Sequence, residues 1–268
     1  MSEFKQYRSQ ILDSEVRLNG KSLPACFNMP ELGVGFITTS YSCFEYINRN
    51  ARIVICGITP GMQQATNALL EARKALLNGA SDEEAVKAAK EVASFSGPMR
   101  RNLVAMLDFV GINGLLGIES CASLFDQDKE LVHYTSTLRY PVFVNGDNYS
   151  GAPNMLKTPC LLQQVETFLA EEVQALSSDC IYIPLGPKVA EALSHLQGKG
   201  LLKPEQIIAG LPHPSGANAE RISYFMGNKE RNQLSAKTNA GSLDNARKAI
   251  LTQVAYLCSR CGINEAAT

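Results

Sequence analysis

The sequence of 268 residues has no tryptophan, only three histidines and no long apolar run. No stretch approaches the roughly 18–20 apolar residues that cross a membrane, so we expect no membrane partner. The polar start, from Met1 to Gln10, lacks the apolar core of a signal peptide. These absences predict a protein that works in the cytoplasm.

Charge of either sign is not in excess. The chain carries 25 basic and 26 acidic residues, a net charge of −1. Such a balance provides no global field that would draw the protein onto nucleic acid or an anionic membrane. If the protein binds DNA, the basic residues that contact phosphates must be gathered locally.

The cysteines do not form a metal-binding pattern. Six of the eight are dispersed, mostly in apolar surroundings that suit reduced thiols. The only close pair is Cys258 and Cys261, and a structural zinc site needs four ligands. We therefore expect no metal at these cysteines. The sequence also gives no sign of an obligate protein partner.

Short β-branched or apolar runs alternate with helical patterns along the chain. Four runs are expected to be strands, at 52–56, 131–137, 180–185 and 206–209, whereas 141–153 is expected to be a loop. Helices are expected at 4–17, 63–79, 82–93, from about 98, at 160–176, from 187 and from 242. Alternation of this kind predicts an α/β fold, a three-layer αβα sandwich around a central four-stranded parallel sheet. We expect a single domain over 1–268, with an N-terminal extension over 1–50 packing on the core, a motif-bearing core over 50–225 and a C-terminal helix over 242–262.

Three of the predicted strands end in turns that contain glycine or proline, at 57–61, 186–188 and 210–218. Ligands of parallel α/β folds bind beyond the carboxyl ends of the strands, so these turns are expected to face one cleft. Each turn also has a plain interpretation as a strand-to-helix connection or a helix entry. His213 is the best candidate among the histidines because prolines on both sides stiffen its loop. His133 and His195 fall on a strand and a helix and are expected to be structural.

Together, the three turns resemble motifs of the uracil-DNA glycosylase superfamily. Gly57-Ile58-Thr59-Pro60-Gly61 is similar to its first motif, in the form of the mismatch-specific and single-strand-selective branches, and His213-Pro-Ser-Gly-Ala-Asn218 is similar to its second. Ile181–Leu193 resembles the strand, turn and helix between them. Phe95–Pro98 and Thr135–Pro141 resemble the pocket segment and the base-reading strand end. The resemblance covers about residues 50–225.

This resemblance implies a monofunctional DNA glycosylase that flips a nucleotide out of DNA and hydrolyses its N-glycosidic bond without metal or cofactor. It assigns to His213 the hydrogen bond that stabilises the departing base anion, and to Thr59 the place of the water-orienting residue. The implied base pocket consists of Gly57, Ile58, Pro60, Gly61, Gln63, Phe95 and Ser136. The implied contacts to the DNA backbone are Gly186, Lys188, Ser215 and Asn218.

Three positions depart from the superfamily pattern. Thr59 stands where active members carry Asn or Asp, and Ser136 aligns with the base-reading Asn. Ala217 aligns with the wedge residue that fills the vacated base stack and is too small to intercalate well. The inserted stretch between Met62 and Phe95 also separates the first motif from the pocket segment.

Two shortened pocket side chains favour a larger base than uracil, such as a hypermodified pyrimidine of bacteriophage DNA, and hence an antiviral defence role. The alternatives are an ordinary uracil or mismatch repair glycosylase, a DNA-binding module of the same fold that has lost catalysis, and an unrelated α/β enzyme acting on free nucleotides. The group that activates water is left open among Asp82, Glu83, Glu84, Asp147, Gln63 and Gln64.

Overall fold

The computed structural model describes residues 2–95 and 97–260, and the chain divides into two compact units. Of the described residues, unit 1 comprises 2–49, 57–94 and 134–176, and unit 2 comprises 50–56, 95, 97–133 and 177–260. Each unit is therefore built from segments far apart in the sequence. The single domain over 1–268 stays a prediction. Among the described helices, none is both long enough and apolar enough to cross a membrane.

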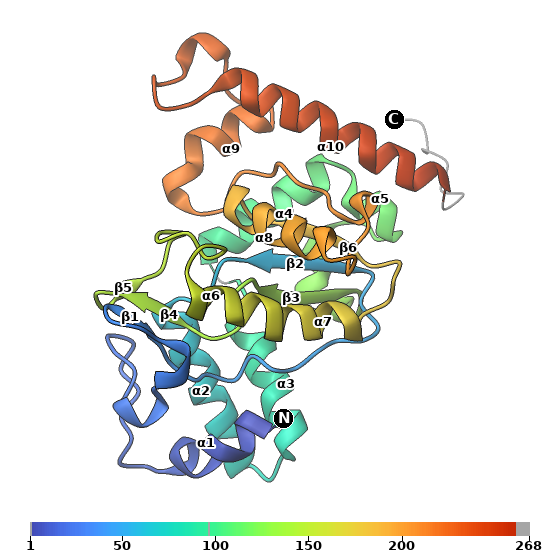
Figure 1. Ribbon diagram of the computed structural model, residues 1–268. Coiled ribbons are helices and arrows are strands. Elements are labelled where there is room, and N and C mark those ends of the chain that lie inside the picture. Colours follow the sequence, from blue (N-terminus) through green and yellow to red (C-terminus); the bar gives the residue numbers. More distant parts are fainter. Residues whose placement is uncertain (1, 96, 261–268) are drawn as a thin grey trace. The chain divides into compact units, whose positions relative to one another are not determined.

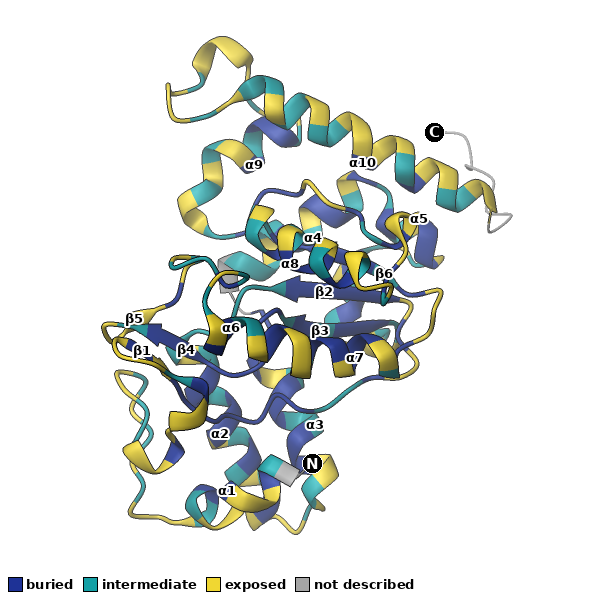
Figure 2. Ribbon diagram, in the orientation of Figure 1, coloured by how far each residue is buried: buried dark blue, intermediate teal, exposed yellow. Residues whose placement is uncertain are grey.

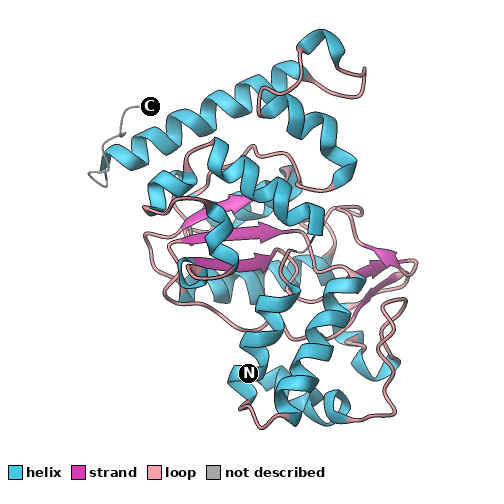
Figure 3. Cartoon of the chain, turned by 180° about the vertical axis from the view of Figure 1, so that it is seen from behind, coloured by secondary structure: helices cyan, strands magenta, loops and turns pink. Residues whose placement is uncertain are grey.

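A parallel sheet contains three of the four predicted strands. Its order is β3 (Val132–Ser136), β2 (Ile53–Gly57) and β6 (Ile181–Pro184), seen as adjacent arrows in Figure 3. β2 pairs with β6 from Ile53 opposite Ile181 to Cys56 opposite Pro184. Residues 53–56 are fully buried, which explains why this strand is a continuous apolar run rather than an alternating one (Figure 2). The predicted α/β class is confirmed.

The predicted fourth strand is wrong, and the sheet has three strands instead of four. Residues 206–209 make a single parallel bridge, between Ile207 and Tyr182, and the Ile208 N–H donates to the Tyr182 carbonyl at 2.9 Å. Beyond this bridge the positive φ of Gly210, +125°, turns the chain out of the strand direction. The Ile207 carbonyl accepts from the Gln253 side chain at 3.2 Å. This carbonyl points away from β6. On the paired side the ladder stops because its next donor would be residue 184 of β6, a proline without an N–H.

Unit 1 contains a helical layer and a small antiparallel sheet. The helices α1 (Ser2–Leu12), α2 (Met62–Leu77) and α3 (Asp82–Ala93) share one core with residues 27–44, which agrees with a packed N-terminal segment (Figure 1). Ser81 caps α3 in the predicted capping box with Glu84. The predicted helix over 160–176 is α6 (Pro159–Gln164), a π-helical stretch (Val165–Leu169) and α7 (Ala170–Ala175).

The loop predicted over 141–153 is partly a β-hairpin. β4 (Val142–Val144) pairs with β5 (Asp147–Asn148) and, on its other side, with β1 (Ile37–Thr39). Asn145 and Gly146 connect the two strands with positive φ values of 52° and 86°. This is the backbone of a tight hairpin turn, for which Asn-Gly is the favoured sequence. The expectation of a loop followed the turn residues and missed the apolar Val142-Phe143-Val144 run beside them.

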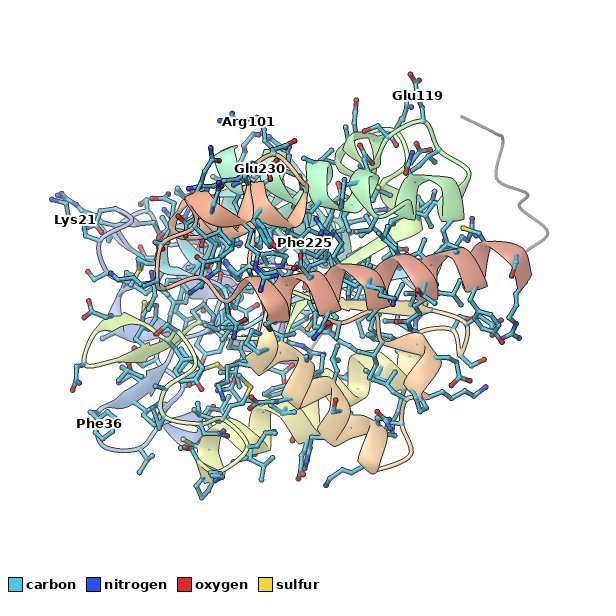
Figure 4. All side chains as sticks on the ribbon, turned by 90° about the horizontal axis from the view of Figure 1, so that it is seen from above. Lys21, Phe36, Arg101, Glu119, Phe225 and Glu230 are labelled. Atoms are coloured by element: carbon cyan, nitrogen blue, oxygen red, sulfur yellow. The ribbon has the colours of Figure 1, made fainter. Side chains whose placement is uncertain are left out.

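Unit 2 surrounds β2 and β6 with helices. They are α4 (Gly97–Phe109), α5 (Ile112–Leu116), α8 (Pro187–Gly198), α9 (Ala219–Phe225) and α10 (Ala240–Arg260). The expected C-terminal helix is confirmed as far as residue 260, and residues 261 and 262 lie outside the described part. Phe225 on α9, labelled in Figure 4 beside α10, is fully buried and meets the Phe109 ring edge-on. Arg247 of α10 donates to the Tyr224 and Phe225 carbonyls, which fixes α10 onto α9.

Unit 1 also buries a cluster of charged side chains. Arg139 donates to Glu172 at 2.8 Å, and Lys90 lies 3.7 Å from the same carboxylate. Glu45 is 7% exposed, and both of its carboxyl oxygens lack a hydrogen-bond partner among the described residues. Burial raises the pKa of Glu45 to about 7, and the nearby Tyr41 hydroxyl and Arg139 charge offset only part of that effect. A carboxyl group without hydrogen bonds is more stable in this interior when it is neutral.

We predict that the stability of the protein falls as pH rises from 5 to 7.5. The pKa of Glu45 is higher in the folded than in the unfolded chain, so its contribution is complete below about 4.5 and is lost as pH rises through about 7. The expected loss is roughly 2 kcal/mol of unfolding free energy. Urea denaturation at several pH values measures it. Glu45→Gln should remove this slope, and an identical slope in the variant would contradict the assignment.

Candidate functional site

The first motif forms a turn in unit 1 directly after β2. The Thr137 and Leu138 N–H groups donate to the Gly57 and Ile58 carbonyls, both at 2.9 Å, so the turn continues the sheet pairing beyond the strand. A β-carbon on Gly57 would lie 3.6 Å from the Ser136 Oγ. Ser136 is half-buried, and its hydroxyl has no hydrogen-bond partner in the part of the chain that the structure describes. Gly57 and Ser136 thus lie side by side with a free hydroxyl between them.

The Thr59 hydroxyl is engaged within the fold. It donates to the Tyr140 carbonyl at 3.0 Å and accepts from the Val142 N–H at 3.1 Å. A hydroxyl has one proton to donate, so only one acceptor lone pair remains for a water molecule. Thr59 therefore connects the turn to β4, and in this arrangement it can orient water only weakly.

The residues after Thr59 begin α2. Pro60 is buried, and Gly61 is the N-cap of the helix, where its N–H donates to the Gln64 Oε1 at 3.0 Å. Gln63 is exposed and donates to Asn67 at 2.8 Å. The Asn148 side chain of β5 accepts from the Met62 N–H at 2.9 Å, which brings the hairpin beside this turn. Sequence reasoning missed Asn148 because its segment was expected to be a loop.

The second motif forms a turn in unit 2. His213 is half-buried, and burial lowers its pKa. The Ser215 N–H donates to the His213 Nδ1 at 3.3 Å. Because Nδ1 accepts this bond, the ring proton of the neutral imidazole resides on Nε2. Nε2–H is then a donor that the motif itself leaves available for a ligand.

The other polar groups of this turn bond to each other. The Ser215 Oγ accepts from the Asn218 side chain at 3.1 Å, and Asn218 accepts from Arg221 at 2.8 Å. Ala217 is exposed within the short 3-10 turn Gly216–Asn218. The implied phosphate contacts of Ser215 and Asn218 would have to share groups that already hold the turn together.

Two contacts hold the His213 turn against helices of unit 2. Asn102 on α4 donates to the Pro214 carbonyl at 2.9 Å. At Gly210 a β-carbon would lie 3.0 Å from the Ala246 Cβ and 3.3 Å from Ile250 of α10. Proline has no N–H, so these contacts replace the backbone bonds that the Leu211–Pro214 segment cannot make. Neither contact was visible in the sequence, because both partners are distant along the chain.

Phe95 adopts an unusual backbone conformation, with φ of +43° and a buried side chain. Arg100 donates to its carbonyl at 2.8 Å, and the same guanidinium lies 4.4 Å from the Phe125 ring centroid. A bulky residue at positive φ is held against local strain and is a feature found at functional sites. Of the segment Phe95–Pro98, Ser96 lies outside the described part, and only the backbone of residues 97 and 98 is described.

Gly186 and Lys188 begin α8 after β6. Gly186 has a φ of +103°, and no atom lies within 4 Å of its hypothetical β-carbon. Lys188 forms an exposed ion pair with Glu191 on the next turn, at 2.9 Å. Exposed pairs of this kind contribute little stability, so the pair can open. While the pair is formed, Glu191 offsets the positive charge that Lys188 would offer to a phosphate.

Most of the proposed water-activating groups have structural partners. Asp82 pairs with Arg8 at 2.8 Å, and Glu84 closes the capping box of α3. Gln64 caps α2. Asp147 is exposed on β5, next to Asn148 and hence near the first turn of α2. No group of three or more metal-ligating side chains occurs within residues 2–95 and 97–260.

The residues of the candidate site are therefore divided between the two units, and each unit gathers its own part. In unit 1 it gathers the 57–61 turn, Ser136 and the β4–β5 hairpin. In unit 2 it gathers the 210–218 turn, Asn102 and α10, while Phe95 and the Gly186 turn belong to the same unit. That all three turns face one cleft stays a prediction.

Comparison with known proteins identifies one relative. The chain is 36% identical over 201 residues to "Uncharacterized protein YoxB" of Bacillus subtilis (strain 168), and the match covers 75% of this chain and 78% of the relative. The chain belongs to the YoxB family. No family model matches the sequence, and no solved structure matches it. The family membership supports a shared fold, and the chemistry has to be argued from the residues.

We predict that Gly210→Ala displaces the His213 turn. The backbone at Gly210 has a positive φ, which alanine adopts with difficulty. The added methyl group would also collide with the Ala246 side chain of α10. We expect a loss of about 1–3 kcal/mol in unfolding free energy. Thermal denaturation measures this loss. Gly216→Ala, where nothing lies within 4 Å, is the matched control and should change stability by much less. Equal effects of the two substitutions would show that contact with α10 does not hold the turn.

Proposed function

We propose that this protein is a monofunctional DNA glycosylase that hydrolyses the N-glycosidic bond of a flipped-out, modified pyrimidine nucleotide and leaves an abasic site. Three-layer packing around the sheet, action on DNA in the cytoplasm and a role in defence against bacteriophages are parts of the same proposal. The support comes from the order of the motifs, the placement of the 57–61 and 186–188 turns after parallel strands and the chemistry available at His213.

The tautomer of His213 carries the proposal. Its Nδ1 accepts the Ser215 N–H, and burial lowers the pKa, so the ring is neutral near pH 7 with its proton on Nε2. A departing pyrimidine accumulates negative charge on its carbonyl oxygen. A fixed N–H donor directed at that oxygen stabilises the transition state more than the ground state.

The remaining residues position the nucleotide and the water. Gly57 lets the base approach the backbone closely, and the Ser136 hydroxyl is free to bond a polar group of the base. Because the Thr59 hydroxyl is largely engaged, the water molecule attacks a sugar that already has oxocarbenium character and needs little activation. Asp147, Glu83 and Gln63, all exposed, are the groups left to orient it.

A bulky modified pyrimidine suits this pocket better than uracil. Ser136 and Thr59 are both shorter than the asparagines expected at these positions, and Gly57 has no side chain. Ser136 stands in place of the base-reading asparagine, whose side-chain amide would select uracil through the hydrogen-bonding groups on the edge of its ring. In the proposed pocket, these three residues take up less space than asparagine, which favours a base with a substituent on its ring.

A DNA-binding module without catalysis is the second candidate. It is favoured by one observation, the double hydrogen bond of Thr59 to Tyr140 and Val142. Such a protein would bind DNA containing an abasic analogue and release no base.

We predict that His213→Ala lowers the rate of base release by roughly 10²–10³-fold. The assay uses two DNAs, one containing uracil and one with heavily modified phage pyrimidines, and mass spectrometry detects the free base. His195→Ala is the matched control. An unchanged rate in His213→Ala would remove this residue from the mechanism. Release of neither base by the parent, with DNA binding retained, would favour the binding module.

The same proposal predicts the proton position on His213. We expect nitrogen-15 NMR at pH 7 to show a neutral ring protonated on Nε2. Since burial lowers the pKa, the midpoint of protonation should lie below the usual value of 6.5. A ring protonated on Nδ1, or already doubly protonated at pH 7, would contradict the assignment.

We predict that Ser136→Asn narrows the pocket. The longer side chain occupies the space beside Gly57, so release of the bulky base should fall at least tenfold while release of uracil stays equal or rises. Ser136→Ala, which removes the hydroxyl and adds no bulk, is the control. Equal loss of both bases in Ser136→Asn would argue against selection by size.

A further inference from the structure

Positive charge is concentrated in the segment that follows the His213 turn. Residues 221–237 contain four basic residues and one acidic residue, a net charge of +3. The other 251 residues contain 21 basic and 25 acidic residues, a net charge of −4. This is the local gathering of basic residues that a nearly neutral protein needs if it is to bind DNA phosphates. We call the part from Lys229 to Thr238 the basic flap.

One carboxylate fastens the basic flap to α9. Glu220 accepts hydrogen bonds from the Ser235 hydroxyl at 2.7 Å and from the Thr238 hydroxyl at 2.5 Å, and it pairs with Lys229 at 3.1 Å. The hydroxyl groups, the Ser235 N–H and Lys229 lower the pKa of Glu220 to about 2. Glu220 is thus ionised at every physiological pH, and the flap is ordered although it contains only one short 3-10 turn, Arg231–Gln233.

A chain of hydrogen bonds links the flap to the His213 turn. Asn218 accepts from the Arg221 guanidinium at 2.8 Å, and the same guanidinium donates to the Lys237 carbonyl at 3.3 Å. Asn218 in turn donates to Ser215, whose N–H binds His213. The flap and the turn are therefore parts of one hydrogen-bonded surface.

Two of the three cations of the flap are not paired with a carboxylate in the part of the chain that the structure describes. Arg231 and Lys237 are exposed, and neither has a carboxylate partner within the described residues. Lys229 is held by Glu220, and Glu230, labelled in Figure 4, is the one acidic residue of the flap. An ordered segment with two unneutralised cations next to a base-binding turn has the chemistry of a phosphate clamp.

We propose that the basic flap binds the phosphodiester backbone of DNA beside the nucleotide at His213, with Arg231 and Lys237 contacting phosphates and with Glu220 and Arg221 positioning the flap. This proposal rests on the proposed glycosylase function and assigns its DNA-binding surface. Phosphate contacts of this kind set the position of DNA without reading its sequence.

The test compares Arg231→Ala/Lys237→Ala with a control that also loses two positive charges, Lys203→Ala/Arg260→Ala. Both control residues belong to unit 2, as the flap does. Arg260 is the last residue of the 21-residue helix α10. Lys203 lies near Glu205, whose carbonyl accepts from Gln253 in the second half of α10. Fluorescence anisotropy measures the Kd of a short labelled duplex at several salt concentrations. We expect the flap variant to bind about tenfold more weakly and its plot of log Kd against log salt to lose a slope of about 2. The control should keep the parent slope.

The variant Glu220→Gln is a second test, in which the expected change in DNA binding is opposite to the effect of charge alone. Removing a negative charge from a DNA-binding surface should by itself strengthen binding. We expect weaker binding instead, with faster trypsin cleavage at Lys229, Arg231 and Lys237, because the flap loses the carboxylate that orders it. Glu205→Gln is the matched control and should change neither quantity. Tighter binding by Glu220→Gln with unchanged cleavage would overturn the positioning role.

The outcomes separate this proposal from the proposed function. If the parent releases a base but the flap variant keeps its Kd and slope, the flap proposal is wrong and the glycosylase proposal stands. If no base is released but the flap variant alone loses its salt dependence, the flap binds DNA and the catalytic proposal is wrong. Preference for RNA of the same length, or for a polyglutamate peptide over DNA, would overturn the assignment of DNA as the partner.

Discussion

The pairing of β2 with β6 is the constraint on which the rest of the molecule depends. Four residues of each strand run parallel and in register, so the chain leaves both strands at the same edge of the sheet. Residues 53–56 of β2 are fully buried, as in strands whose sheet is covered on both faces. The turn that follows β6 leads directly into α8, which belongs to the same unit. The candidate turns therefore begin where buried strands end.

Rigidity at His213 is achieved without regular structure. Two prolines remove backbone donors and fix φ, which would leave the turn with few internal bonds. Three contacts keep the turn in place instead. Asn102 of α4 donates to the Pro214 carbonyl, Gly210 packs against α10, and the Ser215 N–H donates to the His213 ring. Each contact restrains a different part of the turn. An imidazole that is fixed in this way loses little freedom when it binds a base, and preorganisation of this kind is what makes a hydrogen-bond donor effective in catalysis.

The sequence predicted those elements whose patterns are local. β2, β3, β6 and most helices, with the Ser81 cap, follow from apolar runs, periodicity and capping residues. It failed where a distant partner decides: Pro184 of β6 has no N–H with which to continue the ladder to the expected fourth strand, and β4 is a strand because β1 pairs with it. For the candidate site, the sequence singled out His213 and the 57–61 turn, whose roles stay predictions. It could not show that the Thr59 hydroxyl is engaged with Tyr140, or that the buried Glu45 carboxyl has no hydrogen-bond partner among the described residues.

The engagement of Thr59 changes which step of the chemistry the protein must assist. A side chain whose proton is donated to a backbone carbonyl cannot remove a proton from water, so a mechanism that begins with an activated nucleophile is unfavourable here. A mechanism that begins with departure of the base needs a donor at the base oxygen and a fixed sugar. In the proposed glycosylase, His213 is the donor, and phosphate contacts beside the nucleotide are to fix the sugar. If the cationic flap binds those phosphates as proposed, it assists the reaction as well as binding, because it restrains the sugar at the moment when the bond to the base is longest.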